Sequence, residues 1–405
     1  MRLIVQKFGG SSLATPELRD QVVQHILSAK AEGCSPVVVV SAMGRKGDPY
    51  ATDTLLEFIG EILTTPPPRE LDLLLSCGEV LSAAVLAMEV KKRGSEAVAL
   101  TGWQAGIVTD GAYGHAEIVR IKKDKILRFS QDGNVVIVAG FQGAGEDGEI
   151  TTLGRGGSDT SAVALGAALE VELVEIYSDV DTVMTADPRI VPDARPIKNV
   201  GYQEILQMAR EGAKVIHPRA VDIALQYNIP LLLKKTGMHK QGTLVSHKKA
   251  QTDKSFIQRE KLVTGITHVT ALAQVRIQAP LARGQQLEEM LTKLWKAGVS
   301  IDLINLSPQE KMFTIPSSSC QQVREIVAGM GYKAEVSPGF AKVTVVGSGM
   351  RGIPGVMARV VSALNKAGTE ILQTADSHLN ISCLIPEKDV AAAVKALHYE
   401  FNLSD

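Results

Sequence analysis

The chain has 405 residues, which is long enough for two or three domains with cores of their own. Apolar residues make up 45% of it and aromatic residues only 4%, so aliphatic side chains must do most of the packing. The formal net charge of −1 excludes the strong overall field expected of a protein that binds nucleic acid or a membrane surface. An anionic substrate would have to be captured by a few local cations.

The amino terminus reads directly as a strand and lacks the pattern of a secretory signal. We expect no apolar run long enough to span a membrane. The four cysteines show neither metal-binding nor disulfide spacing. These features predict a cytoplasmic protein with reduced thiols.

Strand-like and helix-like segments alternate over residues 1–245. The first helix is expected to begin at Thr15 and Pro16 and to end at Gly33. Residues 37–40 are four valines without alternation, which is typical of a strand covered by helices on both faces. This part is predicted to be a largely parallel α/β sheet sandwiched by helices, with ligands at the carboxyl ends of its strands.

Beyond about residue 260 the elements are shorter, and the order strand, helix, strand, strand, helix, strand occurs twice. The clearest internal echo is between residues 294–298 and 364–368, each of which ends a helix. We therefore expect two small βαββαβ modules after the α/β part. The expected boundaries are 1–245 for the first domain, 246–260 for a linker, and 261–338 and 339–405 for the two modules.

The turn Lys7-Phe8-Gly9-Gly10-Ser11-Ser12 follows the first strand. Its glycines allow the backbone to approach a ligand, and successive amides can bind phosphate oxygens. Lys7 would add a positive charge for a phosphoryl group. An ordinary tight turn with a solvated lysine is an equal alternative for this segment alone.

A second segment, residues 151–159, opens a helix and contains Arg155 flanked by Gly154, Gly156 and Gly157. The glycines clear space, and a guanidinium suits bidentate binding of a carboxylate. Ser158 or Asp159 could instead be only the helix cap. Two further polar segments, residues 178–189 and 212–218, are uninformative individually, and the first is most simply a solvated loop.

In this order the four segments resemble those of the aspartate kinases (aspartokinases), members of the amino-acid kinase superfamily, and the resemblance covers essentially the whole chain. Supporting segments lie at residues 40–44, 52–56 and 75–79. The two carboxy-terminal modules resemble the ferredoxin-like ACT domains that this family uses for feedback control. Residues 43–50 and 373–378 are similar to the diaminopimelate-sensitive isozyme of Gram-positive bacteria.

The resemblance implies transfer of the γ-phosphoryl group of ATP, with Mg²⁺, to the side-chain carboxylate of L-aspartate. Lys7 matches the lysine that contacts the phosphoryl group, Asp159 the residue that orients it, and Lys214 a second phosphate-binding lysine. Arg155 matches the clamp on the substrate α-carboxylate and Glu79 the partner of its ammonium group. The remaining implied contacts to the substrate are Ser41, Thr52 and Ser158, and those to ATP are Gly9, Gly10, Ser11, Ser178, Asp179, Met184, Thr185, Ala186, Asp187, Pro188, Arg189 and Val215.

Two departures from the family pattern concern the nucleotide. Thr182 stands where many relatives have glycine and would be strained at positive φ, so the loop is expected to follow another path. Met184 stands where they have tyrosine, so aromatic stacking on adenine is lost.

The resemblance also implies a homo-oligomer formed through the ACT domains. It further implies an amino-acid effector, for which meso-diaminopimelate, lysine and threonine stay open. The matching effector positions are Asp302, Asn305, Gln373 and Asp376. The alternatives in function are a glutamate or N-acetylglutamate kinase and a catalytically silent amino-acid sensor on a kinase fold.

Overall fold

The computed structural model describes residues 1–179, 182–237, 242–247, 262–278, 284–307, 310–348, 350 and 352–404. The chain divides into two compact units. The first comprises Met1–Val183, Pro196–Ala209 and Lys214–Asp253, and the second comprises Met184–Arg195, Arg210–Ala213 and Lys254–Asp405. Two short segments of the expected first domain thus belong to the second unit. The expected linker, residues 246–260, lies almost wholly outside the described residues, and the expected boundaries stay predictions.

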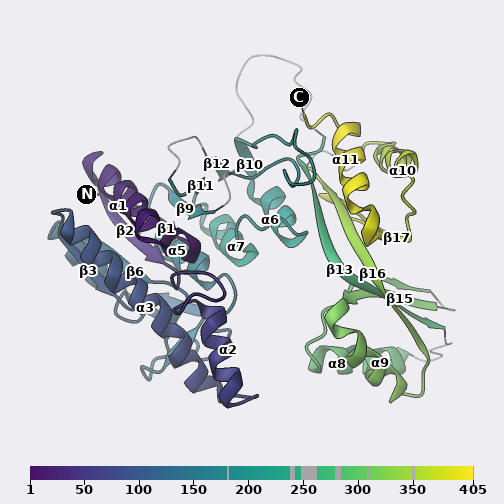
Figure 1. The fold of residues 1–405 in the computed structure, drawn as a ribbon, viewed down its shortest axis with the longest axis horizontal. Helices are drawn as coiled ribbons and strands as arrows, with labels where there is room; N and C mark the ends of the chain where they lie inside the picture. Colours follow the sequence, from purple (N-terminus) through teal and green to yellow (C-terminus); the bar gives the residue numbers. More distant parts are fainter. Residues whose placement is uncertain are drawn as a thin grey trace. The chain divides into compact units, whose positions relative to one another are not determined.

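The main sheet of the first unit has eight strands in the order β10-β12-β11-β9-β1-β2-β6-β3 (Figure 1). All neighbouring pairs are parallel except β11 and β12, which confirms the largely parallel sheet. The strands are β1 (Arg2–Phe8), β2 (Cys34–Val40), β3 (Ala97–Leu100), β6 (Val135–Ala139), β9 (Val174–Ser178), β10 (Asn199–Gly201), β11 (Leu231–Lys235) and β12 (Thr243–Ser246).

Helices cover this sheet. The side chains of Val37–Val40 are all fully buried, so both faces of β2 are covered, as predicted. One core joins β1, β2 and β6 to α1 and α3, while α5 contacts β1, β2 and β9. The helices are α1 (Pro16–Ala31), α2 (Thr52–Ile62), α3 (Pro68–Lys92), α4 (Asp124–Gln131), α5 (Gly157–Ala168), α6 (Tyr202–Arg210) and α7 (Pro218–Tyr227).

The predicted limits of α1 are confirmed. The Thr15 side chain accepts a hydrogen bond from the Leu18 amide at 3.3 Å, and Pro16 is the first helical residue. Gly33 has φ of +80° just after the helix, a conformation that disfavours other residues.

A second sheet in this unit has four short strands in the order β5-β4-β7-β8 and was not predicted. Asp72 of α3 ties the helix to this sheet, because its buried carboxylate accepts hydrogen bonds from the Thr152 amide and hydroxyl, both at 2.7 Å. The strands are β4 (Ile107–Thr109), β5 (Ile118–Ile121), β7 (Gln142–Ala144) and β8 (Ile150–Thr152).

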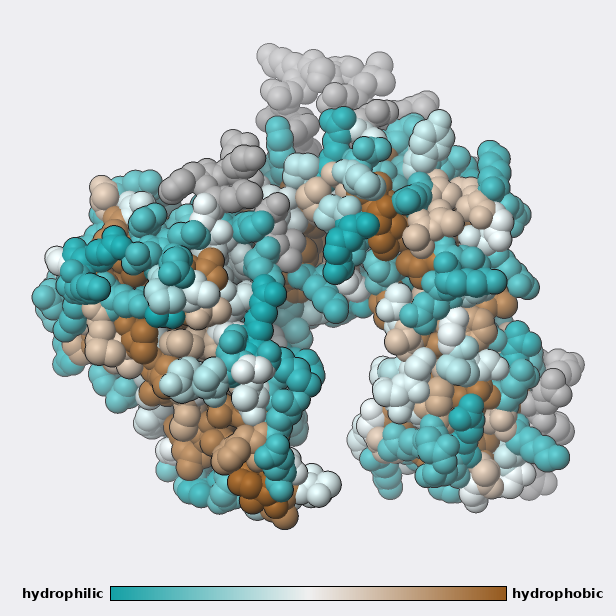
Figure 2. Space-filling view, viewed as in Figure 1, coloured by the Kyte–Doolittle hydropathy of each residue, from teal (hydrophilic) through white to brown (hydrophobic). Residues whose placement is uncertain are grey.

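By length and composition alone, α3 is the one described helix that could cross a membrane. Asp72 and Glu79 interrupt its apolar residues, so this helix contains no uninterrupted apolar run of that length. Half of its most apolar window is buried, and its buried side carries Asp72 and Glu79, as in the core helix of a domain. The neighbouring helix α2 exposes more than half of the side chains of Phe58 and Ile62, and apolar side chains gather in this region in Figure 2.

The second unit contains one six-stranded sheet in the order β14-β15-β13-β16-β18-β17. All pairs are antiparallel. The strands are β13 (Gly265–Gln278), β14 (Asp302–Leu306), β15 (Glu310–Pro316), β16 (Ala334–Val346), β17 (Gln373–Asp376) and β18 (Asn380–Pro386). The helices are α8 (Gly284–Lys296), α9 (Cys320–Ala328), α10 (Val356–Lys366) and α11 (Val390–Glu400).

The long strands β13 and β16 belong to both small modules. The second half of β13 pairs with the first half of β16, and together with β14, β15, α8 and α9 they form the first module. The first half of β13 pairs with residues 342–346 of β16 and supplies the last strand of the second module. A bulge separates the halves, where Ala271 has φ of +56°. The last strand of the second module therefore comes from a segment that precedes the first module in the chain.

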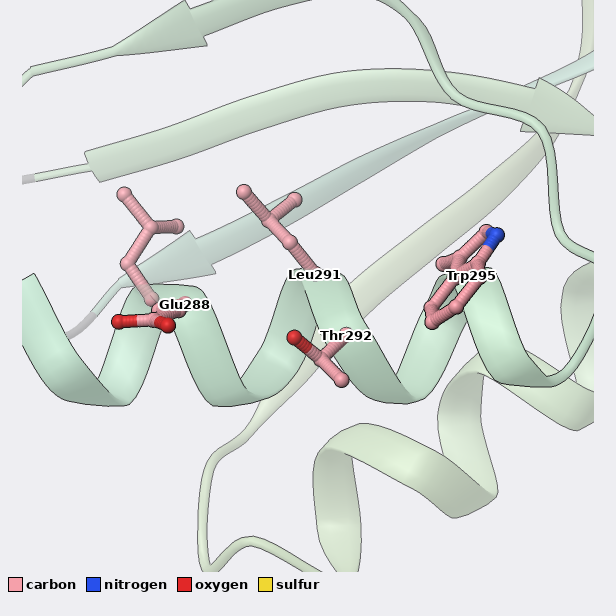
Figure 3. A pocket seen from close by; sticks show the side chains of 5 residues that line it. Glu288, Leu291, Thr292 and Trp295 are labelled. Carbon is pink, nitrogen blue, oxygen red and sulfur yellow. The ribbon is translucent and has the colours of Figure 1, made fainter.

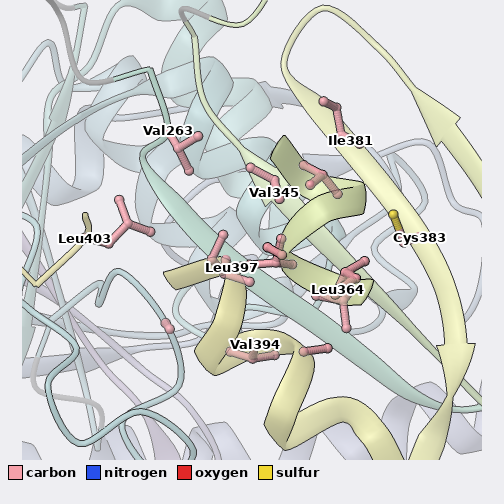
Figure 4. Packing of buried hydrophobic residues seen from close by; sticks show 14 of the residues in the cluster. Val263, Val345, Leu364, Ile381, Cys383, Val394, Leu397 and Leu403 are labelled. Carbon is pink, nitrogen blue, oxygen red and sulfur yellow. The ribbon is translucent and has the colours of Figure 1, made fainter. Parts of the chain in front are cut away.

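Each module has its own hydrophobic core. The core of the second module includes Val345, Leu364, Val394 and Leu397 (Figure 4). Three residues from the segment Met184–Arg195 also belong to it, namely Ala186, Val191 and Ala194. This segment is thus an integral part of the second unit.

Candidate active site

Three turns meet at the carboxyl ends of β1, β2 and β9. The Gly9 amide donates to the Tyr177 carbonyl at 3.2 Å, and the Ser41 amide donates to the Phe8 carbonyl at 3.2 Å. The Gly44 amide donates to the Gly10 carbonyl at 3.0 Å. Parallel strands end at the same edge of a sheet, so the sequence-distant turns after β1 and β2 become neighbours.

Only glycine fits at position 10, because the turn after β2 packs directly against it. A Cβ atom there would lie 2.2 Å from the Ala42 carbonyl oxygen and 2.9 Å from that of Gly44. Gly9 differs, because a Cβ atom would meet nothing closer than 3.7 Å, and one of its nearest atoms is the Lys7 ammonium nitrogen. The open approach to a ligand that the sequence suggested for both glycines therefore applies to Gly9.

Lys7 forms a nearly buried ion pair with Asp159 in the first turn of α5. The distance from Nζ to Oδ1 is 2.7 Å, and the two side chains are 10% and 14% exposed. The second carboxylate oxygen, Oδ2, accepts a hydrogen bond from the His217 amide at 3.2 Å. The predicted orienting role of Asp159 thus has a geometric basis, since the carboxylate fixes the end of a long side chain.

Glu79 of α3 is buried below the turn that follows β2. Its Oε1 accepts a hydrogen bond from the Ala42 amide at 2.9 Å, whereas Oε2 is buried and has no hydrogen-bond partner among the described residues. Burial raises the pKa of Glu79 to about 8, although the Ala42 hydrogen bond and the charge of Lys7 act in the opposite direction. A buried carboxylate oxygen without a partner is suited to a positively charged ligand group.

Arg155 projects from a turn that two glycines shape. Gly154 and Gly156 have φ of +73° and +70°, and a Cβ atom on Gly156 would lie 2.0 Å from the His217 ring. Arg219 of α7 holds the preceding strand end through a hydrogen bond to the Leu153 carbonyl at 3.0 Å. Arg155 is exposed, and nothing in the described parts of the chain pairs with its guanidinium. It is available for an anionic ligand.

The other residues expected to contact the substrate lie on the same elements. Ser41 follows β2, and Ser158 is buried in the first turn of α5, next to Gly140 at the end of β6. Thr52 is the first residue of α2. The exposed Lys214 and its neighbour Val215 precede His217, whose amide binds Asp159. The structure therefore brings Lys7, Gly9, Ser41, Glu79, Ser158 and Asp159 to one edge of the sheet and ties the Lys214 segment to it through His217.

Comparison with known proteins identifies the fold. The model of the amino acid kinase family matches residues 2–235, and the model of an ACT domain matches residues 335–399. Aspartokinase 1 of Bacillus subtilis is 45% identical over 405 residues and covers all of both chains. The aspartokinase of Geobacillus stearothermophilus is 40% identical, with 100% of this chain and 98% of that protein covered. The chain belongs to the aspartokinase family.

Solved aspartokinase structures agree with this assignment. Escherichia coli aspartokinase III in complex with aspartate and ADP superimposes with a TM-score of 0.79 at 24% identity, covering 98% of this chain and 99% of that one. The aspartate kinase of Synechocystis is 34% identical with a TM-score of 0.54, and 99% of this chain and 69% of that one are covered. The first shares the fold, and the second also supports the family.

The positions that the aspartokinase resemblance assigned to ATP fall into two groups. Ser178 ends β9 and follows Tyr177, whose carbonyl accepts a hydrogen bond from the Gly9 amide, and Asp179 forms an exposed ion pair with Arg45 at 2.7 Å. Arg45 was not predicted, although it follows directly after the turn at Gly44. Val180 and Asp181 lie outside the described residues, so the path expected for the loop at Thr182 stays a prediction.

The second group, Met184 to Arg189, lies in the second unit. The Thr185 hydroxyl is 2.9 Å from His398 Nε2 and accepts a hydrogen bond from the Arg195 amide at 2.9 Å. Ala186 is buried in the core of the second module, Met184 packs against that core, and Arg189 pairs with Asp187. These contacts favour a packing role for Met184, Thr185 and Ala186. A nucleotide contact for these three residues, or for Asp187, Pro188 and Arg189, stays a prediction.

The expected effector residues lie at the two edge strands of the second unit. Asp302 and Asn305 are on β14 and are exposed, and Asp376 is exposed on β17. Gln373 is buried, and its side-chain amide donates to the Leu303 carbonyl. Residues from both modules thus meet at Leu303 and Gln373, and their binding of an effector remains a prediction.

No group of three or more His, Cys, Asp or Glu side chains is placed to hold a metal ion within the described part of the chain. A Mg²⁺ ion that accompanies a nucleotide is usually held by phosphate oxygens, water and one or two carboxylates. Exposed Asp179 fits such a donor set. A pocket on α8 in the second unit is lined by Leu287, Glu288, Leu291, Thr292 and Trp295, none of which carries a positive charge (Figure 3). It is not a candidate for the kinase site.

Proposed function

We propose that the protein is an aspartate kinase that transfers the γ-phosphoryl group of ATP to the side-chain carboxylate of L-aspartate, giving 4-phospho-L-aspartate and ADP. The acceptor carboxylate is ionised at neutral pH, so no general base is needed to activate it. The task of the site is to hold two anions in line and to offset their repulsion.

The observation that carries this proposal is that an unpartnered carboxylate oxygen and an exposed guanidinium both lie on elements that contact the same edge of the sheet. Glu79 offers a buried carboxylate oxygen without a partner, and the charge of Lys7 acts on it. Exposed Arg155 offers a guanidinium. A site with an anion for an ammonium group and a cation for a carboxylate suits an amino acid.

Each charged side chain then has a definite task. Arg155 binds the α-carboxylate and Glu79 the α-ammonium group of aspartate, with Ser41, Thr52 and Ser158 beside them. Lys7, fixed by Asp159, offsets negative charge on the phosphoryl group as it approaches the acceptor. Lys214 is the second lysine that binds the phosphates. Bound Mg²⁺ would supply further charge neutralisation on the phosphate oxygens, and Asp179 would have to exchange its ion pair with Arg45 to hold it.

An assay with hydroxylamine tests the proposal, because acyl phosphates react with it to give hydroxamates. The full chain is incubated with Mg-ATP, hydroxylamine and either aspartate, glutamate or N-acetylglutamate. We expect aspartyl hydroxamate. Product with glutamate or its acetyl derivative, and none with aspartate, would indicate another amino-acid kinase, and no product with any acceptor would indicate a silent sensor.

The proposal includes regulation and assembly. An amino acid bound at the ACT modules would control the first step of lysine, diaminopimelate, threonine and methionine biosynthesis. The similarity to the diaminopimelate-sensitive isozyme makes meso-diaminopimelate the first effector to test, followed by lysine and threonine. The exposed edge strand β14 favours a homo-oligomer formed through the ACT domains. The expected location is the cytoplasm.

A further inference from the structure

Lys342 of β16 is a buried lysine that no part of the proposed reaction uses. Its side chain is 7% exposed and makes two ion pairs, with Asp302 of β14 and, at 2.7 Å, with Glu211. Burial acts to lower the pKa of Lys342, but the hydrogen bonds to Asp302 and Glu211 raise it above its ordinary value. When one ammonium group pairs with two carboxylates, a change at either carboxylate alters its interaction with the other.

Glu211 lies in the short segment Arg210–Ala213, which the second unit holds firmly. The Glu211 carboxylate also accepts a hydrogen bond from the Thr344 hydroxyl at 3.1 Å. The next residue, Gly212, has φ of +108°, and a Cβ atom there would lie 2.2 Å from the His268 carbonyl oxygen. The segment is therefore fixed against both β13 and β16, and Lys214 follows it within three residues of Glu211.

Asp302 lies at a strained and partly exposed place. Its side chain is 56% exposed, so a ligand can reach it, although it is paired with Lys342. The adjacent Leu303 has φ of +46°, and the pairing of β14 with β15 is irregular between Asp302 and Asn305. A bulky residue such as leucine rarely adopts positive φ, and such strain clusters at ligand-binding sites and switch regions.

We propose that Lys342 is a positioning residue that couples Asp302 to Lys214 through Glu211. A ligand whose ammonium group binds Asp302 competes with Lys342 for that carboxylate. The ion pair of Lys342 with Glu211 changes as a result. The position of Lys214, and with it the binding of ATP, changes as a result. This inference rests on the proposed function, in which Lys214 binds phosphate.

The first test compares Lys342→Met with Lys311→Met in the full chain. Lys311 is a matched control, because it is equally buried in the same sheet but its ammonium group donates to the Ser307 carbonyl. We expect Lys342→Met to raise the KM for Mg-ATP about threefold to tenfold relative to Lys311→Met, with the KM for aspartate unchanged within about twofold. A purely structural role would not separate the two substrates.

The second test uses Asp302→Asn alone and combined with Lys342→Met. If Lys342 carries the coupling, Asp302→Asn alters the KM for Mg-ATP at least about twofold in the wild-type background and has no effect in the Lys342→Met background. An equal effect in both backgrounds, or identical KM values for Lys342→Met and Lys311→Met, overturns the proposal.

A measurement without turnover keeps this inference distinct from the proposed function. Amide hydrogen exchange of residues 212–217 should be faster in Lys342→Met than in the wild type and in Lys311→Met. Equal exchange in all three proteins contradicts the coupling. A wild-type protein that forms no aspartyl hydroxamate contradicts the proposed function instead, and the exchange comparison still decides the inference.

Discussion

At the scale of single residues, the ion pair of Lys7 with Asp159 makes the strongest prediction. Lys7→Ala should lower kcat about a hundredfold or more, because it removes a cation that acts on the transferring phosphoryl group. The hydroxamate assay measures the loss. Lys46→Ala is the control, since Lys46 pairs with Glu57 at the surface and 69% of its side chain is exposed. Near-normal activity of folded Lys7→Ala would refute the role given to Lys7.

Glu79 predicts how substrate binding depends on pH. With its pKa raised to about 8 by burial, Glu79 is mostly protonated at pH 7 in the free protein. An ammonium group needs the carboxylate form, so aspartate should bind more tightly as the pH rises from 6 to 8, with release of a proton. Calorimetry in buffers of different ionisation enthalpy measures that proton. Glu79→Gln should bind aspartate more weakly and without this pH dependence.

The same shift has a consequence for stability. A carboxyl group whose pKa is raised by folding favours the folded state most below its unfolded pKa of 4.5, and this contribution is lost as the pH rises toward 8. The stability of Glu79→Gln relative to the wild type should therefore increase between pH 5 and 8 in denaturant titrations. A constant difference would show that Glu79 is not perturbed by burial.

Residue types near the site could be predicted from the sequence, but their partners could not. The Lys7 turn and the Arg155 turn carry recognisable glycines. By contrast, the hydrogen bond from the His217 amide to Asp159 and the ion pair of Arg45 with Asp179 join residues far apart in the chain. Only the packing of neighbouring strand ends brings these together. In the sequence, a place for His217 near the site was indicated only by its position three residues after Lys214.

At the scale of elements, the turn before α5 can be tested through Gly156. Gly156→Ala should raise the KM for aspartate, because its Cβ atom would overlap the His217 ring and displace Arg155. Gly148→Ala is the matched control, since Gly148 also has positive φ, +86°, but no atom within 4 Å of the added carbon. We expect each to lose about 1–2 kcal/mol from the backbone conformation and only Gly156→Ala to change the KM.

Thermal unfolding and steady-state kinetics separate the two effects. Equal KM values for aspartate in the two alanine variants would show that the position of Arg155 does not depend on this turn. A loss of stability without a change in KM would assign Gly156 to folding alone.

The elements themselves were predictable where the periodicity was strong. The parallel strands around Val37–Val40 and the limits of α1 follow from apolar runs and from caps. The four-stranded sheet β5-β4-β7-β8 was missed, because three of its strands have only three residues. Strands so short leave no periodic pattern to recognise.

At the scale of the whole molecule, Thr185 tests the assignment of residues 184–195 to the second unit. Thr185→Val should lower the stability of that unit by about 1–3 kcal/mol, because the Arg195 amide and the His398 ring lose a buried partner. Thr369→Val is the control. The Thr369 hydroxyl is also buried but has no hydrogen-bond partner among the described residues, so its loss should cost little.

Denaturant unfolding of the two valine variants gives the comparison. Equal stability of both would mean that the contact between Thr185 and His398 does not hold the segment. A specific loss of ATP affinity in Thr185→Val, without loss of stability, would instead favour the predicted nucleotide contact of Thr185.

The domain plan was predictable in outline and not in detail. Periodicity and the internal echo indicated an α/β part followed by two small modules. A linear division of the sequence could not show that residues 184–195 and 210–213 pack with the later unit. The sequence does not indicate which hydrophobic core contains Ala186, Val191 and Ala194.

The shared strand β13 also constrains how the protein is made. Its first half is synthesised early, but its partner in the second module, residues 342–346 of β16, leaves the ribosome only after the whole first module. Until then one edge of the nascent strand has no partner and is exposed to association with other chains. The completion of translation and the closing of the second module are thus linked in time. A chain that ends prematurely within the first module would carry an unpaired strand, which chaperones and proteases can recognise.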